Sequence, residues 1–306
     1  MPILPPGASI WTLFREAFAD WLDDRAPRLG AALAYYTALS LAPLLLIAIG
    51  IAGMAFGAEA AQGRVVGELR NLVGDDGGRA IQDMLEHART PSAGIIATTV
   101  GAVTLLLGAA GVFGQLQDAL NTIWEVTPRP GRGWRGFLKD RFLSLTMVLG
   151  TGFLLLVSLV VTAGIAAAGE SLRGISPGVE ALAELATMLV SFCVVVVLFA
   201  MIYKFLPDAE IAWREVWIGA VVTAALFVVG KFAIGLYLGH ASIGSAYGAA
   251  GSFVVLLVWV YYSAQVLLFG AELTQVYARR TGRRVEPARG AIRIEQKAAA
   301  PRERSA

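Results

Sequence analysis

The chain has 306 residues, of which 57% are apolar and only 16% charged, and its formal net charge is +2. Its mean hydropathy of +0.65 lies far outside the usual range of soluble proteins. This composition excludes a water-soluble globular domain and predicts an integral membrane protein.

Six apolar stretches are long enough to cross a bilayer as helices, because about 20 residues span the ~30 Å hydrocarbon core. They lie at about 30–56, 94–115, 143–168, 182–205, 215–238 and 250–273. No cleavable signal peptide is expected before them, since residues 1–29 lack a basic start, a short apolar core and a small-residue cleavage site. The predicted fold class is all-α, a polytopic membrane protein with six transmembrane helices.

Basic residues are distributed unevenly between the connections. Of the 25 Lys and Arg residues, nineteen fall in the N-terminal segment, the second-to-third and fourth-to-fifth connections and the C-terminal tail. Five fall in the other connections, and Lys231 lies inside a span. Because basic residues are retained in the cytoplasm, both termini are predicted to be cytoplasmic, as an even number of spans requires.

Three segments outside the spans have distinct patterns. Residues 1–29 contain apolar residues at helical spacing opposite Arg15 and several aspartates, which predicts an amphipathic helix at the cytoplasmic surface. Residues 58–90 predict short external amphipathic helices, acting either as a solvated cap or lid or as a partner surface. Residues 279–306 carry nine basic and three acidic residues, which predicts a disordered cytoplasmic tail whose deletion from 285 leaves folding intact. The six-span membrane domain then covers residues 30–278.

The first span combines two different faces. Gly30, Ala34 and Ala38 are four residues apart and predict a face for close helix packing. Tyr36, Ser40 and Pro43 follow one another on another face, and the proline frees a backbone carbonyl and predicts a kink. The hydroxyl groups either satisfy this carbonyl or contact a substrate.

The second span carries a heptad seam of small and polar residues, beginning at Gly94. Such a seam is typical of close helix packing in lipid. Alternatively, it widens toward Gln115, Asp118 and Asn121 into a polar cytoplasmic cavity.

Charge inside the remaining spans is scarce, and intramembrane charge often marks a transport path. Lys231 lies in the fifth span, where its side chain either snorkels to the outer surface or faces a cavity. Glu272 lies near the cytoplasmic end of the sixth span, which also carries Gln265. Because Lys231 and Glu272 differ in depth, we expect Arg141 or Arg28 to be the partner of Glu272 instead.

Enzyme chemistry has little support in the sequence. The two histidines, His87 and His240, are predicted to be external, and the single Cys193 lies in an apolar helix where core packing is expected. No metal-ligand cluster, phosphate-binding loop or nucleophile motif is present. We therefore expect no catalytic residues, no metal, no cofactor and no enzymatic activity.

Four stretches together resemble one known family. They are ALAYYTALSLAPLLL in the first span, LNTIWEVTPRPGRGWRGFLKDRFLSL at 120–145, YKFLPDAEIAWREVWIGA at 203–220 and YGAAGSFVVLLVWVYYSAQVLLFGAELTQV at 247–276. Over about residues 10–280 the chain resembles the YihY/virulence factor BrkB family of bacterial inner-membrane proteins. The resemblance implies six spans in the bacterial plasma membrane. Members of this family have been linked to serum resistance and envelope lipid export, and an earlier ribonuclease label is regarded as mistaken.

Two functions from different classes fit these observations. One is a transporter or translocator of lipids or other anionic amphiphiles, with anionic headgroups meeting the basic cytoplasmic segments. The other is a structural or assembly factor of the envelope that moves no substrate. No nucleic-acid partner is expected, because a nuclease needs a general base or metal ligands that the sequence does not supply.

Overall fold

The computed structural model describes residues 9–57, 111–129, 177–240, 251–283 and 285–294, with short helical pieces between 59 and 86. Residues 111–123 are helical, and the long helices are α1 (Ile10–Asp23), α2 (Ala26–Phe56), α6 (Pro177–Phe205), α7 (Trp213–His240) and α9 (Gly251–Arg280). Among the described residues, three helical stretches are long and apolar enough to cross a membrane: Glu184–Phe205, Trp213–Ile234 and Phe253–Arg280. The chain is thus a mainly helical membrane protein, as expected. The predicted spans 94–115, except its last five residues, and 143–168 lie outside the described residues.

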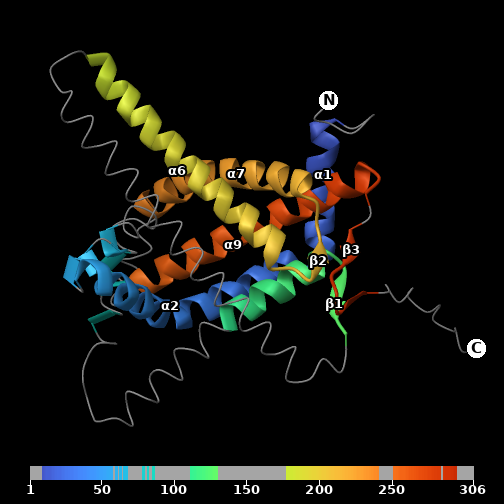
Figure 1. Cartoon of the computed structure of the whole chain (residues 1–306), viewed down its shortest axis with the longest axis horizontal. Coiled ribbons are helices and arrows are strands. Elements are labelled where there is room, and N and C mark those ends of the chain that lie inside the picture. The colour runs from blue at the N-terminus through green and yellow to red at the C-terminus, as the bar shows by residue number, and fades with distance from the viewer. Residues whose placement is uncertain are drawn as a thin grey trace, which may run out of the picture.

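Helix α9 lies at the centre of the described bundle. Helices α1, α2 and α7 pack against it, and α6 packs against α7 (Figure 1). The main core cluster joins residues of α2, helix 111–123, α6, α7 and α9, with Leu268 and Ala271 of α9 fully buried. Any group buried on α9 is therefore enclosed by several helices.

Small residues bring α7 and α9 into close contact. Gly219 of α7 faces Thr274 of α9, and Gly270 of α9 faces Thr223 of α7. The Tyr203 hydroxyl on α6 bonds to Thr223 Oγ1 at 3.0 Å and donates to the Leu267 carbonyl at 2.7 Å. Three helices thus meet at one junction where only glycine leaves enough room.

The first two helices meet at a sharp turn. Ser9 caps α1, and α1 ends where the Asp24 N–H donates to the Asp20 carbonyl. Arg25 then takes a left-handed conformation with φ of 55°, and α2 begins at Ala26 with a proline in its first turn, where no N–H partner is needed. Helix α2 therefore begins before the predicted boundary at residue 30. It continues through Pro43, whose side chain lies outside the described residues.

Helix α1 has the predicted amphipathic character. Leu13 and Ala17 are buried against Leu273 and Val276 of α9. The apolar side chains Ile10, Trp11, Phe18 and Leu22 remain exposed. Arg279 and Arg280 at the end of α9 form ion pairs with Asp20 and Glu16. These pairs hold α1 across the end of α9, with an apolar face left open.

Two small antiparallel sheets, which the all-α prediction did not include, lie at one end of the mainly helical bundle. Strand β1 (Val126–Pro128) pairs with β4 (Ala291–Arg293), and β2 (Ala209–Glu210) pairs with β3 (Glu286–Pro287). The prediction of a disordered tail is therefore wrong for residues 285–294. A strand of two or three residues is too short to show an alternation of apolar and polar residues, and its pairing partner is distant in sequence. These strands were therefore not predicted. We call this end of the bundle, with the start of α7 and the ends of α6 and α9, the strand end.

The opposite end of α2 and α9 is covered by part of the segment 58–90. Ile81 and Leu85 are helical and buried, and they pack with Leu45, Ile49 and Leu256. This agrees with the short amphipathic helices predicted for residues 58–90. The Gly-Asp-Asp-Gly part at 74–77 lies outside the described residues.

One expectation about the core is wrong. Cys193 is exposed on α6, not packed in the interior. An all-round apolar sequence does not show which face of a helix meets the protein, because lipid and core are equally apolar.

Candidate functional site

The most unusual side chain of the described bundle is Glu272 on α9. It is 0% exposed, and none of the described residues donates a hydrogen bond to either of its carboxylate oxygens. A buried charge without a partner is expensive, so such groups are seldom retained without a role. Glu272 is the centre of the candidate site.

The nearest chemistry to Glu272 is acidic. The Asp24 carboxyl, in the turn between α1 and α2, lies within hydrogen-bond reach of the Glu272 carboxyl, and a bond forms between them when Glu272 carries a proton. Burial raises the pKa of Asp24 from 3.8 to about 6, and the charges of Glu125, Asp20 and Asp23 raise it further, while the bond to Glu272 opposes the rise. We call Asp24 and Glu272 the acid pair.

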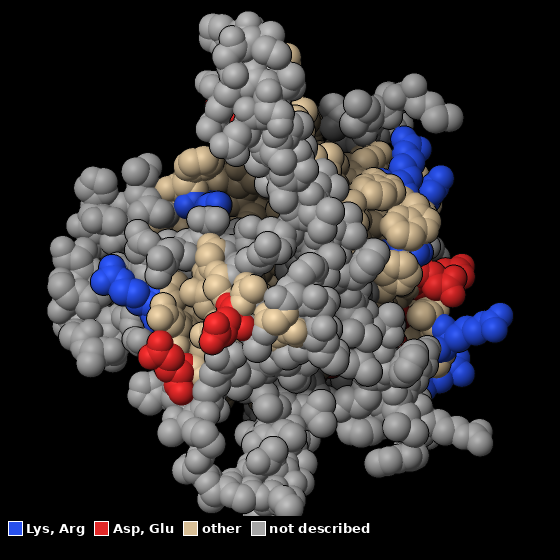
Figure 2. All heavy atoms as spheres, turned by 60° about the vertical axis from the view of Figure 1, so that its left-hand side comes forward, with Lys and Arg blue, Asp and Glu red and all other residues tan. Residues whose placement is uncertain are grey.

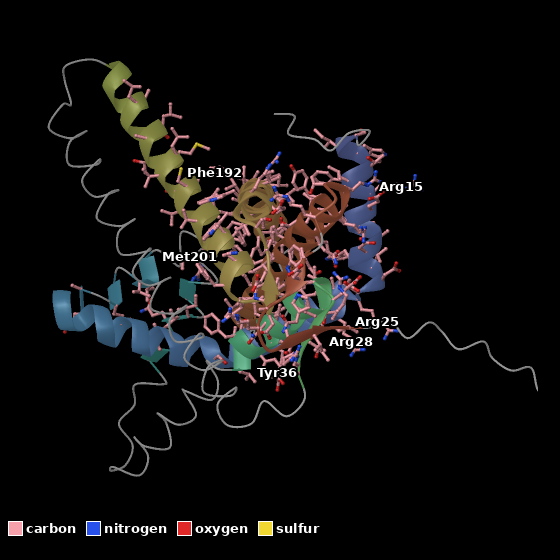
Figure 3. The ribbon with its side chains drawn as sticks, turned by 45° about the vertical axis from the view of Figure 1, so that its right-hand side comes forward. Arg15, Arg25, Arg28, Tyr36, Phe192 and Met201 are labelled. Carbon is pink, nitrogen blue, oxygen red and sulfur yellow. The ribbon has the colours of Figure 1, made fainter. Side chains whose placement is uncertain are left out.

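The arginine expected beside Glu272 is elsewhere. Arg28 is exposed at the start of α2, at the edge of the bundle, and Arg141 lies outside the described residues (Figure 3). The charged groups that act on Glu272 are Asp24, Asp20 and Arg279. Arg28 is not among these groups, so the prediction of Arg28 as the partner of Glu272 is wrong. Arg279 is itself paired with Asp20 at 2.8 Å.

Helix 111–123 closes the site from the strand end. Its last carbonyl, on Ile123, accepts a 2.6 Å hydrogen bond from Gln275, three residues after Glu272 on α9. The next residue, Trp124, is buried with no acceptor for its indole N–H among the described residues, and the Trp21 indole N–H shares this property. The described bundle therefore contains a buried carboxylate without a donor and two buried indole donors without an acceptor.

Two backbone positions beside the site are strained. Among the described non-glycine residues, positive φ occurs at Arg25 (55°) and Glu125 (52°). Arg25 follows Asp24 directly, and Glu125 is one of the charges that act on Asp24. Such conformations cost about 1–3 kcal/mol each and cluster at functional sites.

A second polar contact joins helix 111–123 to the loop after α6. The Asn121 amide donates to Asp208 Oδ2 at 3.2 Å, and the Asp208 N–H donates to Asn121 Oδ1 at 2.8 Å. Gln117 also donates to Asp208 Oδ2, at 3.3 Å. Partial burial of the carboxyl and the Asp208 charge raise the pKa of the neighbouring Asp118. Sequence reasoning named Asn121 and Asp118 but missed Asp208, because no local pattern links positions 87 residues apart.

The other predicted site residues are scattered. Ser40 is buried, Tyr36 is 42% exposed beside Gly111, and Gln115 is half-buried. Gln265 on α9 packs against Gly30 of α2, and its amide donates to the Pro27 carbonyl at 3.5 Å. The structure does not bring these side chains together with the acid pair.

Lys231 is half-buried on α7 and far from Glu272. Gly219 lies opposite Thr274 and Gly230 opposite Tyr262, so α7 and α9 run antiparallel and Lys231 is level with Tyr261. Eleven residues separate that level from Glu272, or about 16 Å at 1.5 Å per residue. This agrees with the expectation that the two do not pair.

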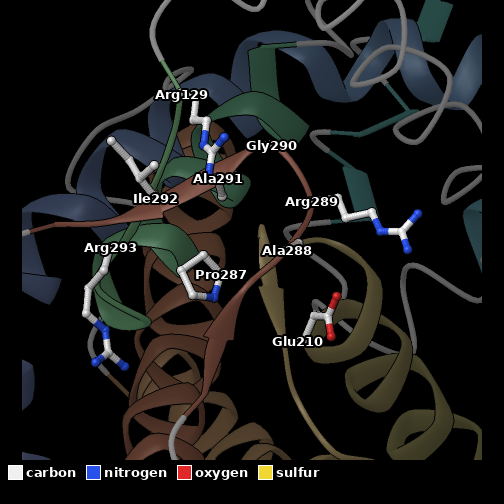
Figure 4. A pocket seen from close by; sticks show the side chains of 9 residues that line it. All are labelled: Arg129, Glu210, Pro287, Ala288, Arg289, Gly290, Ala291, Ile292 and Arg293. Carbon is white, nitrogen blue, oxygen red and sulfur yellow. The ribbon is translucent and has the colours of Figure 1, made fainter.

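A basic pocket of about 560 Å³ lies at the strand end. Arg129, Arg289 and Arg293 line it together with Glu210 and the β3–β4 turn (Figure 4). Sequence reasoning assigned two of these arginines to a disordered tail and so missed the pocket.

Aromatic side chains surround the start of α7, which begins three residues after Glu210, one of the residues that line this pocket. Trp213 and Trp217 stack at 6.2 Å, Phe205 packs edge-on to Trp213, and Lys204 lies over the Trp213 ring. All three aromatic residues are exposed. Exposed Trp beside Lys is typical of the level of lipid headgroups.

Comparison with known proteins gives the family of the chain. The family model described as virulence factor BrkB matches residues 17–294. A UPF0761 membrane protein of Rhodospirillum centenum is 30% identical over 265 residues, covering 85% of this chain and 56% of the relative. A UPF0761 membrane protein of Pseudomonas aeruginosa is 30% identical over 261 residues, covering 83% and 59%. The chain thus spans less than three fifths of the length of these curated relatives. No solved structure matches significantly.

Proposed function

The chain belongs to the virulence factor BrkB family of membrane proteins, and from this premise we propose that it translocates lipids or other anionic amphiphiles. We place it in the bacterial inner membrane with six spans and both termini in the cytoplasm. The strand end then faces the cytoplasm, in keeping with its basic residues Lys204, Arg279, Arg280 and Arg283.

Glu272 is the observation that carries a transport role. A carboxylate inside an apolar helix costs about 2.5–3.5 kcal/mol on insertion scales, and here no described donor offsets it. A purely structural bundle is more stable with an apolar residue at this position. A protein that moves a polar group through the membrane has a use for such a side chain.

The basic pocket indicates the class of substrate. Arginine guanidinium groups bind phosphate oxygens through charge-assisted hydrogen bonds. Glu210, which lines the pocket, precedes Trp213 by three residues, and exposed Trp is typical of the level of lipid headgroups. Figure 2 shows charged side chains of the described residues toward the left and the right of the face in view. The favoured substrate is an amphiphile with a phosphate-bearing headgroup.

The proposal includes no enzymatic step, cofactor or nucleic-acid partner. Membrane phosphates are the nearest anionic groups to the basic strand end. The structure offers the acid pair and the basic pocket as binding groups, and transport across a bilayer needs no covalent chemistry.

A vesicle experiment tests this function. The purified chain is reconstituted in vesicles that contain headgroup-labelled phosphatidylglycerol or phosphatidylcholine, and loss of label to an external quencher is measured. We expect protein-dependent movement that favours phosphatidylglycerol. Replacing Arg129, Arg289 and Arg293 together by alanine should reduce this preference toward parity.

The matched control is Arg15→Ala, which removes one arginine from α1, outside the pocket. This variant should keep the wild-type preference. If the folded wild-type protein moves neither lipid, the translocator function is wrong and the alternative of an envelope structural factor is favoured.

A further inference from the structure

The acid pair needs a positive charge or a proton to offset the repulsion between its two carboxyl groups. Two carboxyl groups in hydrogen-bond contact repel each other when both are ionised, because a carboxylate has acceptor atoms only. The contact between Asp24 and Glu272 becomes a hydrogen bond only if one of them carries a proton.

Among the described residues, no hydrogen-bond donor and no unpaired positive charge beside the pair replaces the proton. Glu272 is completely buried and receives no hydrogen bond from these residues, and Asp24 is among the groups that act on its carboxyl. The charges facing the pair are Asp20 and Asp23 of α1, Glu125 after helix 111–123, and Arg279 of α9. Only Arg279 is positive, and it is bound to Asp20.

The charged residues of helices α6 and α7 named here do not add a free positive charge beside the acid pair. Lys204 at the end of α6 donates to the Ile211 carbonyl, and Glu215 at the start of α7 pairs with Arg283 at 3.3 Å. A metal ion is not favoured either, because no group of three or more His, Cys, Asp or Glu in the described part of the chain is placed to hold one.

We propose that Asp24 and Glu272 bind one proton between them, and that binding and release of this proton accompany substrate movement. The second half rests on the translocator function proposed above. The first half concerns the acid pair alone.

Proton uptake begins at the half-exposed Asp24, next to the strand end. A hydronium ion gives its proton to the Asp24 carboxylate and leaves as water. The proton then passes to Glu272, and the new O–H group of Glu272 donates to an Asp24 oxygen, so the charge of the pair changes from −2 to −1. The raised pKa of Asp24, about 6, allows this exchange near neutral pH.

Infrared difference spectroscopy of the full chain in phosphatidylglycerol vesicles tests the proton directly. The carbonyl stretching band of a protonated carboxyl group is followed between pH 5 and 9 in sodium-free buffer. We expect a band that titrates in the wild type and is lost in both Asp24→Asn and Glu272→Gln. Because the two substitutions lie on different elements, misfolding of one leaves the other as a test.

The matched control is Glu215→Gln. Glu215 is also a buried glutamate at the strand end, but it has an arginine partner and needs no shared proton. This variant should keep the titrating band. A wild type without the band, a band that survives in both acid-pair variants, or a band displaced by added sodium at constant pH would each overturn the proton site.

The coupling is tested by lipid movement in the same vesicles. If the wild-type rate changes about tenfold over the pH range of the band, Asp24→Asn should change less than about twofold. An unchanged pH dependence in this variant refutes the coupling. A wild type that moves no lipid at any pH contradicts the translocator function and the coupling, while the infrared result still decides whether the acid pair holds a proton.

Discussion

Asn121 and Asp208 show how single side chains fix the strand end. Each residue both donates to the other and accepts from it, through side chain and backbone. Both side chains are more than 90% buried, so breaking the contact leaves polar groups without water. The contact joins helix 111–123 to the short loop between α6 and β2.

Replacing Asn121 by alanine should lower the free energy of unfolding by about 2–4 kcal/mol, because a buried N–H and a buried carboxylate lose partners. Thermal unfolding of the purified protein in detergent measures this loss. Gln117→Ala is the matched control, since it removes a single 3.3 Å bond at a half-buried position and should cost under about 1.5 kcal/mol. Equal losses in the two variants would contradict the argument.

The pKa of Asp24 predicts a pH-dependent stability. Since its folded pKa of about 6 lies above the ordinary 3.8, the native state holds the proton more tightly, and this group's contribution falls as pH rises from about 4 to 6. Asp24→Asn removes the titration and supplies an amide that can donate to Glu272. We expect a gain of about 1–2 kcal/mol at pH 7.5, reduced for partial exposure, and little change at pH 4. Urea unfolding at both pH values provides the measurement, and an equal gain at both would refute the assignment.

At the scale of elements, close packing depends on Gly270. A Cβ atom there would overlap the Thr223 hydroxyl, to which the Tyr203 hydroxyl is hydrogen-bonded, and would lie 2.9 Å from Thr223 Cβ. Gly270→Ala should therefore destabilise the α6–α7–α9 junction by about 1–3 kcal/mol. Thermal unfolding in lipid nanodiscs measures the effect.

The control for this prediction is Gly114→Ala in helix 111–123. No described atom lies within 4 Å of the added methyl group, and alanine favours a helix over glycine by about 0.5–1 kcal/mol. This variant should be neutral or stabilising. A loss of stability in both would indicate a general intolerance of alanine and not a packing contact at Gly270.

How far the elements could be predicted depends on their length. Long apolar stretches predicted α6 and α7 within about five residues at each end, and α9 except for its last seven residues, and helical spacing predicted α1. The short strands β1 to β4 had no such signal. Packing faces were predictable only where small residues repeat, as at Gly30, and not on α6, where Cys193 is exposed.

The candidate site was predictable only in part, because local sequence patterns do not show long-range contacts. Glu272 and Asn121 stand out as polar residues in or beside apolar helices. Their partners Asp24 and Asp208 lie in connections between helices and meet them only through the fold. Sequence patterns locate the costly groups, whereas long-range contacts determine what lies beside them.

At the scale of the whole molecule, the C-terminal segment joins the separate parts of the strand end. The Ala288 N–H donates to the Asp208 carbonyl at 2.9 Å, and the Ile294 N–H donates to the Glu125 carbonyl at 2.8 Å. The Arg129 N–H donates to the Gly290 carbonyl at 3.0 Å. Segments after helix 111–123, α6 and α9 are thus held in one platform beside the acid pair.

Two truncations test this role of the tail. Ending the chain at residue 294 keeps both strand pairs and should leave the free energy of unfolding within about 0.5 kcal/mol of the full chain. Ending it at residue 284 removes β3 and β4 with at least three backbone hydrogen bonds at about 1 kcal/mol each, and uncovers residues packed beneath the strands. We expect the shorter chain to lose about 3–5 kcal/mol, read from thermal unfolding in detergent. Equal stability of the two truncated chains would show that the strand pairs contribute little, as the expectation of a disordered tail requires.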